Sequence, residues 1–297
     1  MAMRTVEFAA GLKADIYVPA SDARGAGEAG DAGVAREALP VILWLHGGAW
    51  RVGDRTLAPD LQRYFADRGF AMVSIDYRLS GDAVFPAQLD DVRTAIRWVK
   101  EHAADYSFDP DAIGLWGSSA GGHLAALAAV TADAADIATA VHAVVDGYGA
   151  ADLLAPDQDV PPTVGLLGGP VQERRDLAIA ASPARHVTSS APPFLILHGG
   201  ADPLVPASQS VTLFEALAAA DVPATLYVID GFGHGFFNPV GGEELAGPPI
   251  DAGHLEADPH ANATVRVHPA APGDAISPPA ASFDLIESFF RTHLTRP

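Results

Sequence analysis

The chain has 297 residues, 49% of them apolar and 19% charged, so it can bury a large core and global disorder is excluded. Its formal net charge of −19 argues against nucleic acids and anionic membrane surfaces as partners, and no apolar run has the length of a membrane-spanning helix. The sequence has no cysteine, which excludes disulfides, thiolate nucleophiles and cysteine-based zinc sites.

The chain begins with two apolar segments, TVEFAA and ADIYVP, separated by Gly11 and Leu12, which predict an antiparallel hairpin. Residues 20–38 are rich in Ala, Gly and acidic side chains and predict a surface linker. Six further strands are predicted at 41–46, 71–76, 112–117, 142–147, 193–198 and 225–230. Five of these six runs are almost continuously apolar, which is typical of parallel strands that are buried on both faces.

Helical patterns alternate with these strands. They lie at 60–69, 86–103, 121–132, 207–221 and 282–294. Strand alternating with helix predicts an α/β fold, with a mostly parallel eight-stranded sheet flanked by helices in a single domain spanning 1–297. Two segments depart from the alternation: 148–191 is interpreted as a partial cap, and 238–280, rich in Pro, Gly and Ala, as an irregular insertion.

A Gly-Ser-Ser-Ala-Gly motif at 117–121 follows a predicted strand and opens a predicted helix. It matches G-x-S-x-G, in which a sharp turn exposes the central serine above the sheet at a helix N-terminus. Side chains at Gly117 and Gly121 would collide with neighbouring elements, and the helix terminus favours an anion beside Ser119. The motif therefore predicts that Ser119 is a nucleophile.

A serine hydroxyl needs a base, and the base needs an acid that orients it; in this arrangement the chain order is Ser, Asp or Glu, His. The loops after the last two predicted parallel strands supply Asp202 and His234. Asp230 is a rival acid, but Asp202 is preferred because it follows a different strand from the one that carries the base. Of the other histidines, His123 is placed in the helix after Ser119. The segment 238–280 holds three that are expected to be solvated: His254, His260 and His268.

The segment LHGGAW, at 45–50, follows the third strand. Its glycines allow backbone N–H groups to turn toward one point, which predicts an oxyanion hole together with the N–H of Ala120. Only backbone donors are required, so Ala49 is compatible with this role.

These motifs resemble those of α/β-hydrolase-fold carboxylesterases. The sequence is similar to bacterial esterases like hormone-sensitive lipase, and most similar to the branch typified by bifunctional feruloyl/acetyl esterases. The resembling stretches include VILWLHGGAWRVGDR, IGLWGSSAGGHLAALAA, HGGADPLVPASQS and GFGHGFF, and they cover most of 40–237. The resemblance implies the triad Ser119, Asp202 and His234. It also implies that Gly48, Ala49 and Ala120 donate to the oxyanion, with Gly47 as a further candidate, and that Asp76 and Asp91 are structural.

Four aromatic residues are expected to line the substrate site: Trp50, Tyr148, Phe232 and Phe236. Large rings close to the nucleophile shorten an acyl pocket, and neither 20–38 nor 238–280 has the apolar stripe of a lipase lid. The sequence therefore predicts a serine esterase acting on small short-chain or aryl esters through an acyl-enzyme.

Two alternatives remain open at this stage, an aryl-formamidase or amide hydrolase of the same fold, and a non-catalytic ligand-binding relative. A dinucleotide-binding oxidoreductase is disfavoured because no G-x-G-x-x-G follows the first parallel strand. No cofactor and no metal are expected, since no histidine has zinc-site spacing. The N-terminal residues lack the apolar stretch of a signal peptide, so a cytoplasmic protein is expected. The oligomeric state is left open.

Overall fold

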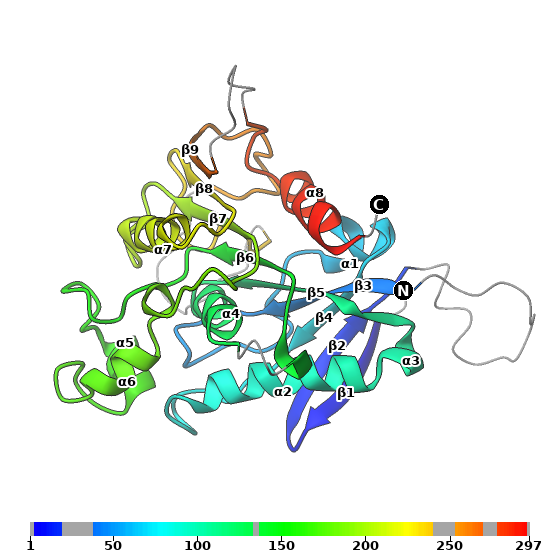
Figure 1. Ribbon diagram of the computed structural model, residues 1–297, viewed down its shortest axis with the longest axis horizontal. Helices are drawn as coiled ribbons and strands as arrows, with labels where there is room; N and C mark the ends of the chain where they lie inside the picture. The colour runs from blue at the N-terminus through cyan, green and yellow to red at the C-terminus, as the bar shows by residue number, and fades with distance from the viewer. Residues whose placement is uncertain (1–2, 20–37, 133–136, 240–252, 270–277, 296–297) are drawn as a thin grey trace, which may run out of the picture.

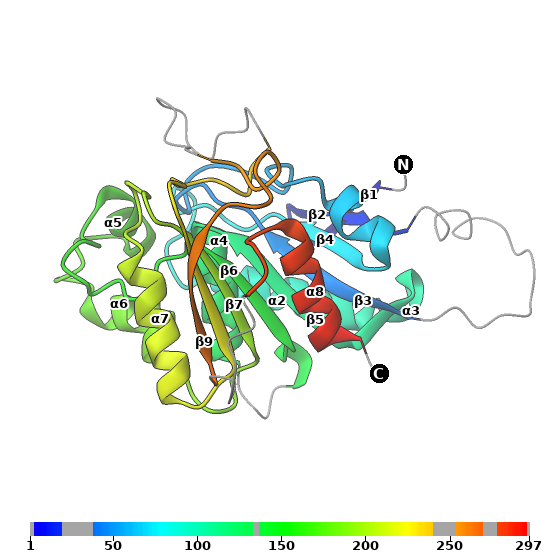
Figure 2. The same ribbon diagram turned by 90° about the horizontal axis from the view of Figure 1, so that it is seen from above.

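The computed structural model describes residues 3–19, 38–132, 137–239, 253–269 and 278–295, and these contain one nine-stranded sheet (Figures 1 and 2). The strand order is β1-β2-β4-β3-β5-β6-β7-β8-β9. Strands β3 to β8 run parallel, whereas β1 and β2 form the predicted hairpin at one edge. The bounds are β1 Met3–Ala9, β2 Leu12–Tyr17, β3 Leu39–Leu45, β4 Ala71–Ile75, β5 Phe108–Ser118, β6 Ala143–Gly147, β7 Phe194–Gly199, β8 Ala224–Ile229 and β9 Ala263–His268.

Helices cover both faces of this sheet (Figure 1). Helices α2, α4 and α7 supply apolar side chains to the core on one face, and α1 and α8 to the core on the other. The α-helices are α1 Leu61–Tyr64, α2 Ala87–Glu101, α3 Ala103–Tyr106, α4 Ala120–Val130, α5 Pro161–Leu167, α6 Arg175–Ala180, α7 Ser208–Ala219 and α8 Phe283–Leu294. Short 3₁₀ helices are η2 Ala66–Arg68, η3 Ile137–Thr139 and η4 Pro183–Arg185.

Strand β3 shows why the parallel strands are apolar throughout. Leu43 and Leu45 belong to the core beneath α2 and α4, whereas Ile42 and Trp44 belong to the core beneath α1 and α8. Successive side chains of a strand point to opposite faces, so a strand covered on both sides must be apolar at every position. The predicted α/β class and the six parallel strands are confirmed.

Strand β9 corrects the prediction of eight strands and of an irregular insertion at 238–280. It pairs antiparallel with β8, from Ala224 opposite His268 to Ile229 opposite Ala263. Its sequence, ATVRVH, alternates apolar and polar residues, as an edge strand with one solvated face does. Such a strand has no continuous apolar run, which is the pattern that predicts the other strands. Two parts of the predicted insertion, 240–252 and 270–277, lie outside the described residues, and so does most of the linker predicted at 20–38.

The segment 148–191, predicted to have little strand character, contains α5, α6 and η4 and no strand. Helix α5 begins with two prolines, which suit the first turn of a helix because its N–H groups have no intrahelical acceptor. It ends at Gly168, whose positive φ of 69° is a left-handed helix cap. The segment lies together at one end of the molecule (Figure 1). None of the helices in the described ranges has the length and apolar character needed to cross a membrane.

Helix α4 approaches the sheet so closely that glycine is required at the contact. A Cβ atom on Gly121 would lie 2.0 Å from the carbonyl oxygen of Leu45, and one on Gly117 would lie 2.3 Å from the backbone of Gly121. Both contacts are with backbone, which cannot move aside as a flexible side chain can. This approach fixes where β5 ends and α4 begins.

The close contact predicts the effect of one added methyl group. Gly121→Ala should lower the free energy of unfolding by about 3 kcal/mol or more, because the strand and the helix must separate. Gly165→Ala in α5 is the matched control, since its Cβ would meet nothing nearer than the Ser80 hydroxyl at 3.6 Å. The control should be neutral or slightly more stable than wild type. Urea unfolding of the three proteins makes the comparison, and equal stabilities would contradict the argument.

Candidate active site

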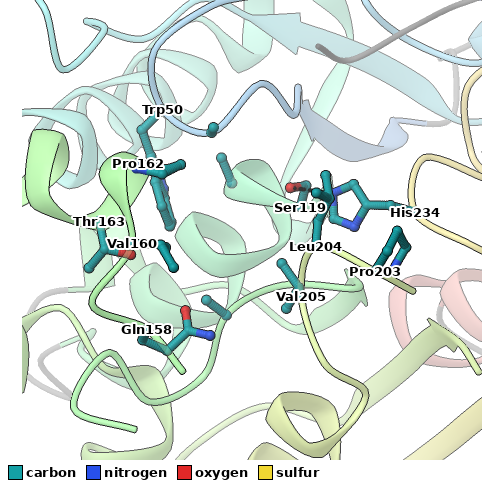
Figure 3. Close-up of a pocket in the computed structure, with 13 residues that line it drawn as sticks. Trp50, Ser119, Gln158, Val160, Pro162, Thr163, Pro203, Leu204, Val205 and His234 are labelled. Carbon is teal, nitrogen blue, oxygen red and sulfur yellow. Dashed lines mark hydrogen bonds between the residues drawn. The ribbon is translucent and has the colours of Figure 1, made fainter. Parts of the chain in front are cut away.

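Ser119 sits at the junction between β5 and α4 in a strained backbone conformation. Its φ of 51° and ψ of −115° lie where non-glycine residues are rare. The Ser119 N–H donates to the carbonyl of Gly147 at 2.7 Å, and its own carbonyl accepts from the N–H of His123 at 2.9 Å. These two bonds hold the turn, and the Ser119 side chain faces a cavity (Figure 3).

His234 and Asp202 join Ser119 in one hydrogen-bonded chain. His234 Nε2 lies 2.8 Å from Ser119 Oγ, and His234 Nδ1 lies 2.7 Å from Asp202 Oδ2. A carboxylate can only accept, so Nδ1 carries the proton and Nε2 is left to accept from the serine hydroxyl. The three residues come from the ends of β5, β7 and β8, which meet at the carboxyl edge of the parallel sheet.

The Asp202 carboxylate is buried but fully partnered. Its Oδ1 accepts from the backbone N–H groups of Leu204 and Val205, at 2.8 and 3.0 Å. A second histidine, His198, places Nε2 3.3 Å from Oδ2. Burial alone would raise the pKa of the Asp202 carboxyl, but the hydrogen bonds from His198 and His234 outweigh it and hold that pKa well below its usual range. Asp202 is therefore a carboxylate at neutral pH.

The rival acid Asp230 is exposed, and its backbone N–H donates to the carbonyl of Asn262. The three histidines of 238–280 were expected to be solvated, but only one of them is exposed. His260 is exposed, but His254 is partly buried beside the Asn238 carbonyl, and His268 lies on β9 with Nε2 3.1 Å from Asp221.

A cavity of about 300 Å³ opens beside Ser119 and His234 (Figure 3). Its volume is at the lower end for small-molecule sites. The walls are mostly small and apolar. They are formed by Ala49, Trp50, Ser119, Ala120, Ala150, Gln158, Val160, Pro162, Thr163, Pro203, Leu204, Val205 and His234.

The loop after β3 lines this cavity with strained backbone. Gly48 has a φ of 110°, and Ala49 and Trp50 have φ values of 55° and 58°. A Cβ atom on Gly48 would lie 2.1 Å from the carbonyl oxygen of Val52, so only glycine fits there. Ala120 lines the same cavity and is the first residue of α4, where an N–H has no intrahelical acceptor. The cavity therefore has backbone of both predicted oxyanion elements in its wall.

Trp50 is held in the cavity wall by His123. The indole Nε1 donates to His123 Nδ1 at 3.1 Å, and His123 Nε2 lies 2.7 Å from the carbonyl of Ala181. An indole N–H only donates and a carbonyl only accepts, so His123 is neutral with its proton on Nε2. Burial lowers the pKa of His123 to about 4, against the opposing effect of the Ala181 bond. The sequence indicated the position of His123 but not this contact.

Three of the four aromatic residues predicted to contact substrate lie elsewhere. Trp50 lines the cavity, whereas Tyr148, Phe232 and Phe236 are buried in the core beneath α8. The Tyr148 ring packs edge-on against His234 at 4.7 Å and against Phe236 at 4.6 Å. Tyr148 thus supports the His234 ring, and Phe236 supports Tyr148 in turn. The positions of these rings in the sequence could not show that they face the core and not the cavity.

Each of the two aspartates implied to be structural accepts hydrogen bonds from at least one backbone N–H group and from an arginine side chain. Asp76 accepts from the N–H of Arg55 at 3.0 Å and from that of Lys13 at 3.2 Å. Asp91 accepts from the N–H of Arg78 at 2.9 Å and also from its guanidinium. In the described ranges, no cluster of three or more His, Cys, Asp or Glu side chains is arranged to hold a metal ion.

The family model BD-FAE matches residues 32–217, more than half of the chain. The chain belongs to the BD-FAE family. Among curated proteins it is 40% identical to Esterase LipQ of Mycobacterium tuberculosis over 203 residues, which are 63% of this chain and 48% of LipQ. The resemblance to α/β-hydrolase esterases is thereby confirmed. The BD-FAE match includes Ser119 and Asp202 and ends before His234, so the role of His234 rests on the distances given above.

Solved structures agree with this assignment. A truncated carbohydrate esterase from gut microbiota superposes with a TM-score of 0.65 and 32% identity, over 75% of this chain and 83% of that one. A thermophilic esterase from Thermogutta terrifontis, Est2 with propionate bound, has a TM-score of 0.64 and 29% identity, over 82% and 89%. The α/β-hydrolase fold is therefore confirmed. The chain spans about half the length of the curated relatives it matches.

Sequence reasoning missed the part of the cavity that comes from 148–191. Gln158, Val160, Pro162 and Thr163 line it, and no motif or periodicity marks them. It also missed His198, for which a signal existed: a histidine at the end of β7, four residues before Asp202.

The buried, neutral state of His123 predicts a pH dependence of stability. An unfolded histidine has a pKa of about 6.5, so between that pH and the folded value of about 4 the unfolded chain binds a proton that the folded chain does not. Stability therefore falls as the pH falls through this window, by up to about 1 kcal/mol per pH unit from this residue.

Removing the imidazole should remove that part of the slope. In urea unfolding measured from pH 7 to pH 4.5, His123→Asn should lose less stability per pH unit than wild type, whatever its absolute stability. His260→Asn, at an exposed histidine, is the control and should keep the wild-type slope. An unchanged slope in His123→Asn would contradict the neutral assignment.

Proposed function

We propose that this chain is a serine carboxylesterase that hydrolyses small carboxylic esters through an acyl-enzyme. The observation that carries the proposal is the continuous hydrogen-bonded chain from Ser119 through His234 to Asp202, with the serine facing a cavity. The curated and solved relatives are themselves named as esterases, which supports it.

In the proposed reaction, Ser119 Oγ attacks the ester carbonyl carbon while His234 Nε2 takes its proton. Asp202 holds the imidazole in the tautomer that accepts this proton and stabilises the imidazolium that results. The backbone N–H groups of Gly48, Ala49 and Ala120, with Gly47 as a further candidate, donate to the tetrahedral oxyanion. His234 then returns the proton to the leaving alcohol, and a water molecule, deprotonated in turn by His234, hydrolyses the acyl-enzyme. Each step uses only protein groups and water.

The proposed substrates are short. The preference for short substrates is supported by the cavity volume of about 300 Å³ and by the mostly small side chains around Ser119. The aromatic rings expected from the sequence do not provide this support, apart from Trp50. The Est2 relative is described with propionate, a short acid, bound to it. We also propose that 148–191 acts as a partial cap of a single domain, because its residues form one wall of the cavity. Cytoplasmic localisation stays a prediction.

The nucleophile can be tested against its neighbour in the same motif. Ser119→Ala should fold normally and lose on the order of 10⁶ in kcat, as expected when the nucleophile of a triad is removed. Ser118→Ala is the control, because the Ser118 hydroxyl is buried and makes no hydrogen bond among the described residues. An organophosphonate probe should label wild type and Ser118→Ala but not Ser119→Ala. Activity retained in Ser119→Ala would refute the proposal.

The acid can be tested in the same way. Asp202→Asn should bind substrate but lose about 10⁴ in kcat, because the amide favours the wrong imidazole tautomer. Asp230→Asn, at the exposed rival, should retain wild-type kcat. If the large loss followed the change at Asp230, the acid would have to be reassigned.

Acyl length is the third test. With p-nitrophenyl esters from acetate to palmitate, kcat/KM should be highest between acetate and butyrate, because a further methylene adds about 0.8 kcal/mol only where apolar surface receives it. No jump in rate is expected above the solubility limit of an ester. A maximum at decanoate or longer would show a groove that the cavity volume does not provide.

A further inference from the structure

The apolar cavity beside Ser119 has two polar side chains in its far wall. Gln158 and Thr163, both from 148–191, line it on the side opposite Ser119 and His234 (Figure 3). Trp50 and Val160 lie between Thr163 and Ser119 in this view. The cavity thus has reactive groups at one end, an apolar middle and polar groups at the other end.

The Thr163 hydroxyl has no partner. Thr163 is only 1% exposed, and its Oγ1 makes no hydrogen bond in the described structure. An unsatisfied buried hydroxyl costs about 1–3 kcal/mol, so such groups normally bind something. Figure 3 shows Oγ1 on the side of Thr163 that faces Val160 and the cavity.

Gln158 has hydrogen-bonding capacity to spare. It is 4% exposed, and the hydrogen bond recorded for its amide nitrogen is a long one, 3.5 Å to Asp157 Oδ1. A glutamine amide offers two N–H donors and a carbonyl acceptor, and a threonine hydroxyl can both donate and accept. A ligand group that both donates and accepts is the natural complement of this pair, and a neutral hydroxyl is the smallest such group.

We infer that Gln158 and Thr163 form a hydroxyl-recognition subsite, so that this enzyme prefers esters in which one half carries a hydroxyl group beyond an apolar spacer. The inference rests on the proposed esterase function and specifies its substrate class. The spacer packs along Trp50 and Val160 while Ser119 attacks the carbonyl. Because a hydroxyl placed in a purely apolar pocket is penalised, the subsite reverses the preference that the other walls alone would give.

Matched ester pairs test the inference in both halves of the substrate. Hexyl acetate is compared with 6-hydroxyhexyl acetate, and methyl hexanoate with methyl 6-hydroxyhexanoate, with butyl analogues to vary the spacer. In at least one series, wild type should favour the hydroxylated member by roughly 10-fold in kcat/KM, the value of one or two neutral hydrogen bonds. A preference for the plain ester in every series would overturn the inference.

Substitutions then assign the preference to the subsite. Thr163→Val keeps the side-chain shape and removes the hydroxyl, so it should abolish the preference, measured as the ratio of kcat/KM between the two members of a pair. Thr163→Ser keeps the hydroxyl and should retain the preference. Gln158→Met, similar in length, should weaken it independently and covers the case in which Thr163→Val fails to fold. A preference that persists in both Thr163→Val and Gln158→Met would overturn the inference.

A reference substrate separates this inference from the proposed function. p-Nitrophenyl acetate carries no hydroxyl, so its hydrolysis reports turnover without the subsite, whereas the subsite is measured as the ratio of kcat/KM between the two members of each ester pair. If wild type does not hydrolyse it, the esterase proposal fails. Calorimetric binding of the same ester pairs to Ser119→Ala still decides the subsite in that case, because it needs no turnover. Hydrolysis of the reference without any hydroxyl preference would overturn the subsite alone.

Discussion

The position of Ser119 depends on a contact between helix α4 and the sheet that leaves no room for side chains. Gly117 and Gly121 meet backbone at 2.3 and 2.0 Å from where a Cβ would be. With α4 pressed against β3 and β5, the chain between them must turn within one residue, and that residue takes a left-handed φ of 51°. Strain at Ser119 is thus a consequence of close packing, and packing on both faces of the sheet maintains it.

The same helix organises the rest of the site. Its first residue, Ala120, lines the cavity, and one turn later His123 accepts the indole N–H of Trp50. Trp50 belongs to the loop whose strained backbone lies beside Ala120. A shift of α4 would therefore move Ser119, Ala120 and Trp50 together. His123 does not itself line the cavity, but it holds Trp50, which does.

His234 and Asp202 follow two neighbouring strands, β8 and β7, on the other side of Ser119. Asp202 is held by two backbone N–H groups and by two imidazoles, of which only His234 reaches Ser119. His198 is itself fixed by the Ser210 hydroxyl at 2.7 Å and the Val205 carbonyl at 2.8 Å. With Tyr148 packed edge-on against the His234 ring, the imidazole is supported at its Nδ1 and on its ring surface.

The sequence by itself determined the parallel sheet, the turn at Ser119 and the loops that carry Asp202 and His234, because burial on both faces and a tight turn impose residue types locally. It did not reveal β9, whose single partly buried face leaves a weak alternating pattern. Only tertiary structure decided that Tyr148, Phe232 and Phe236 lie in the core and not in the cavity wall, and that Gln158 and Thr163 line the cavity. Periodicity reports that a side chain is buried, but its neighbours in space come from segments far away in the chain, and no local pattern encodes them.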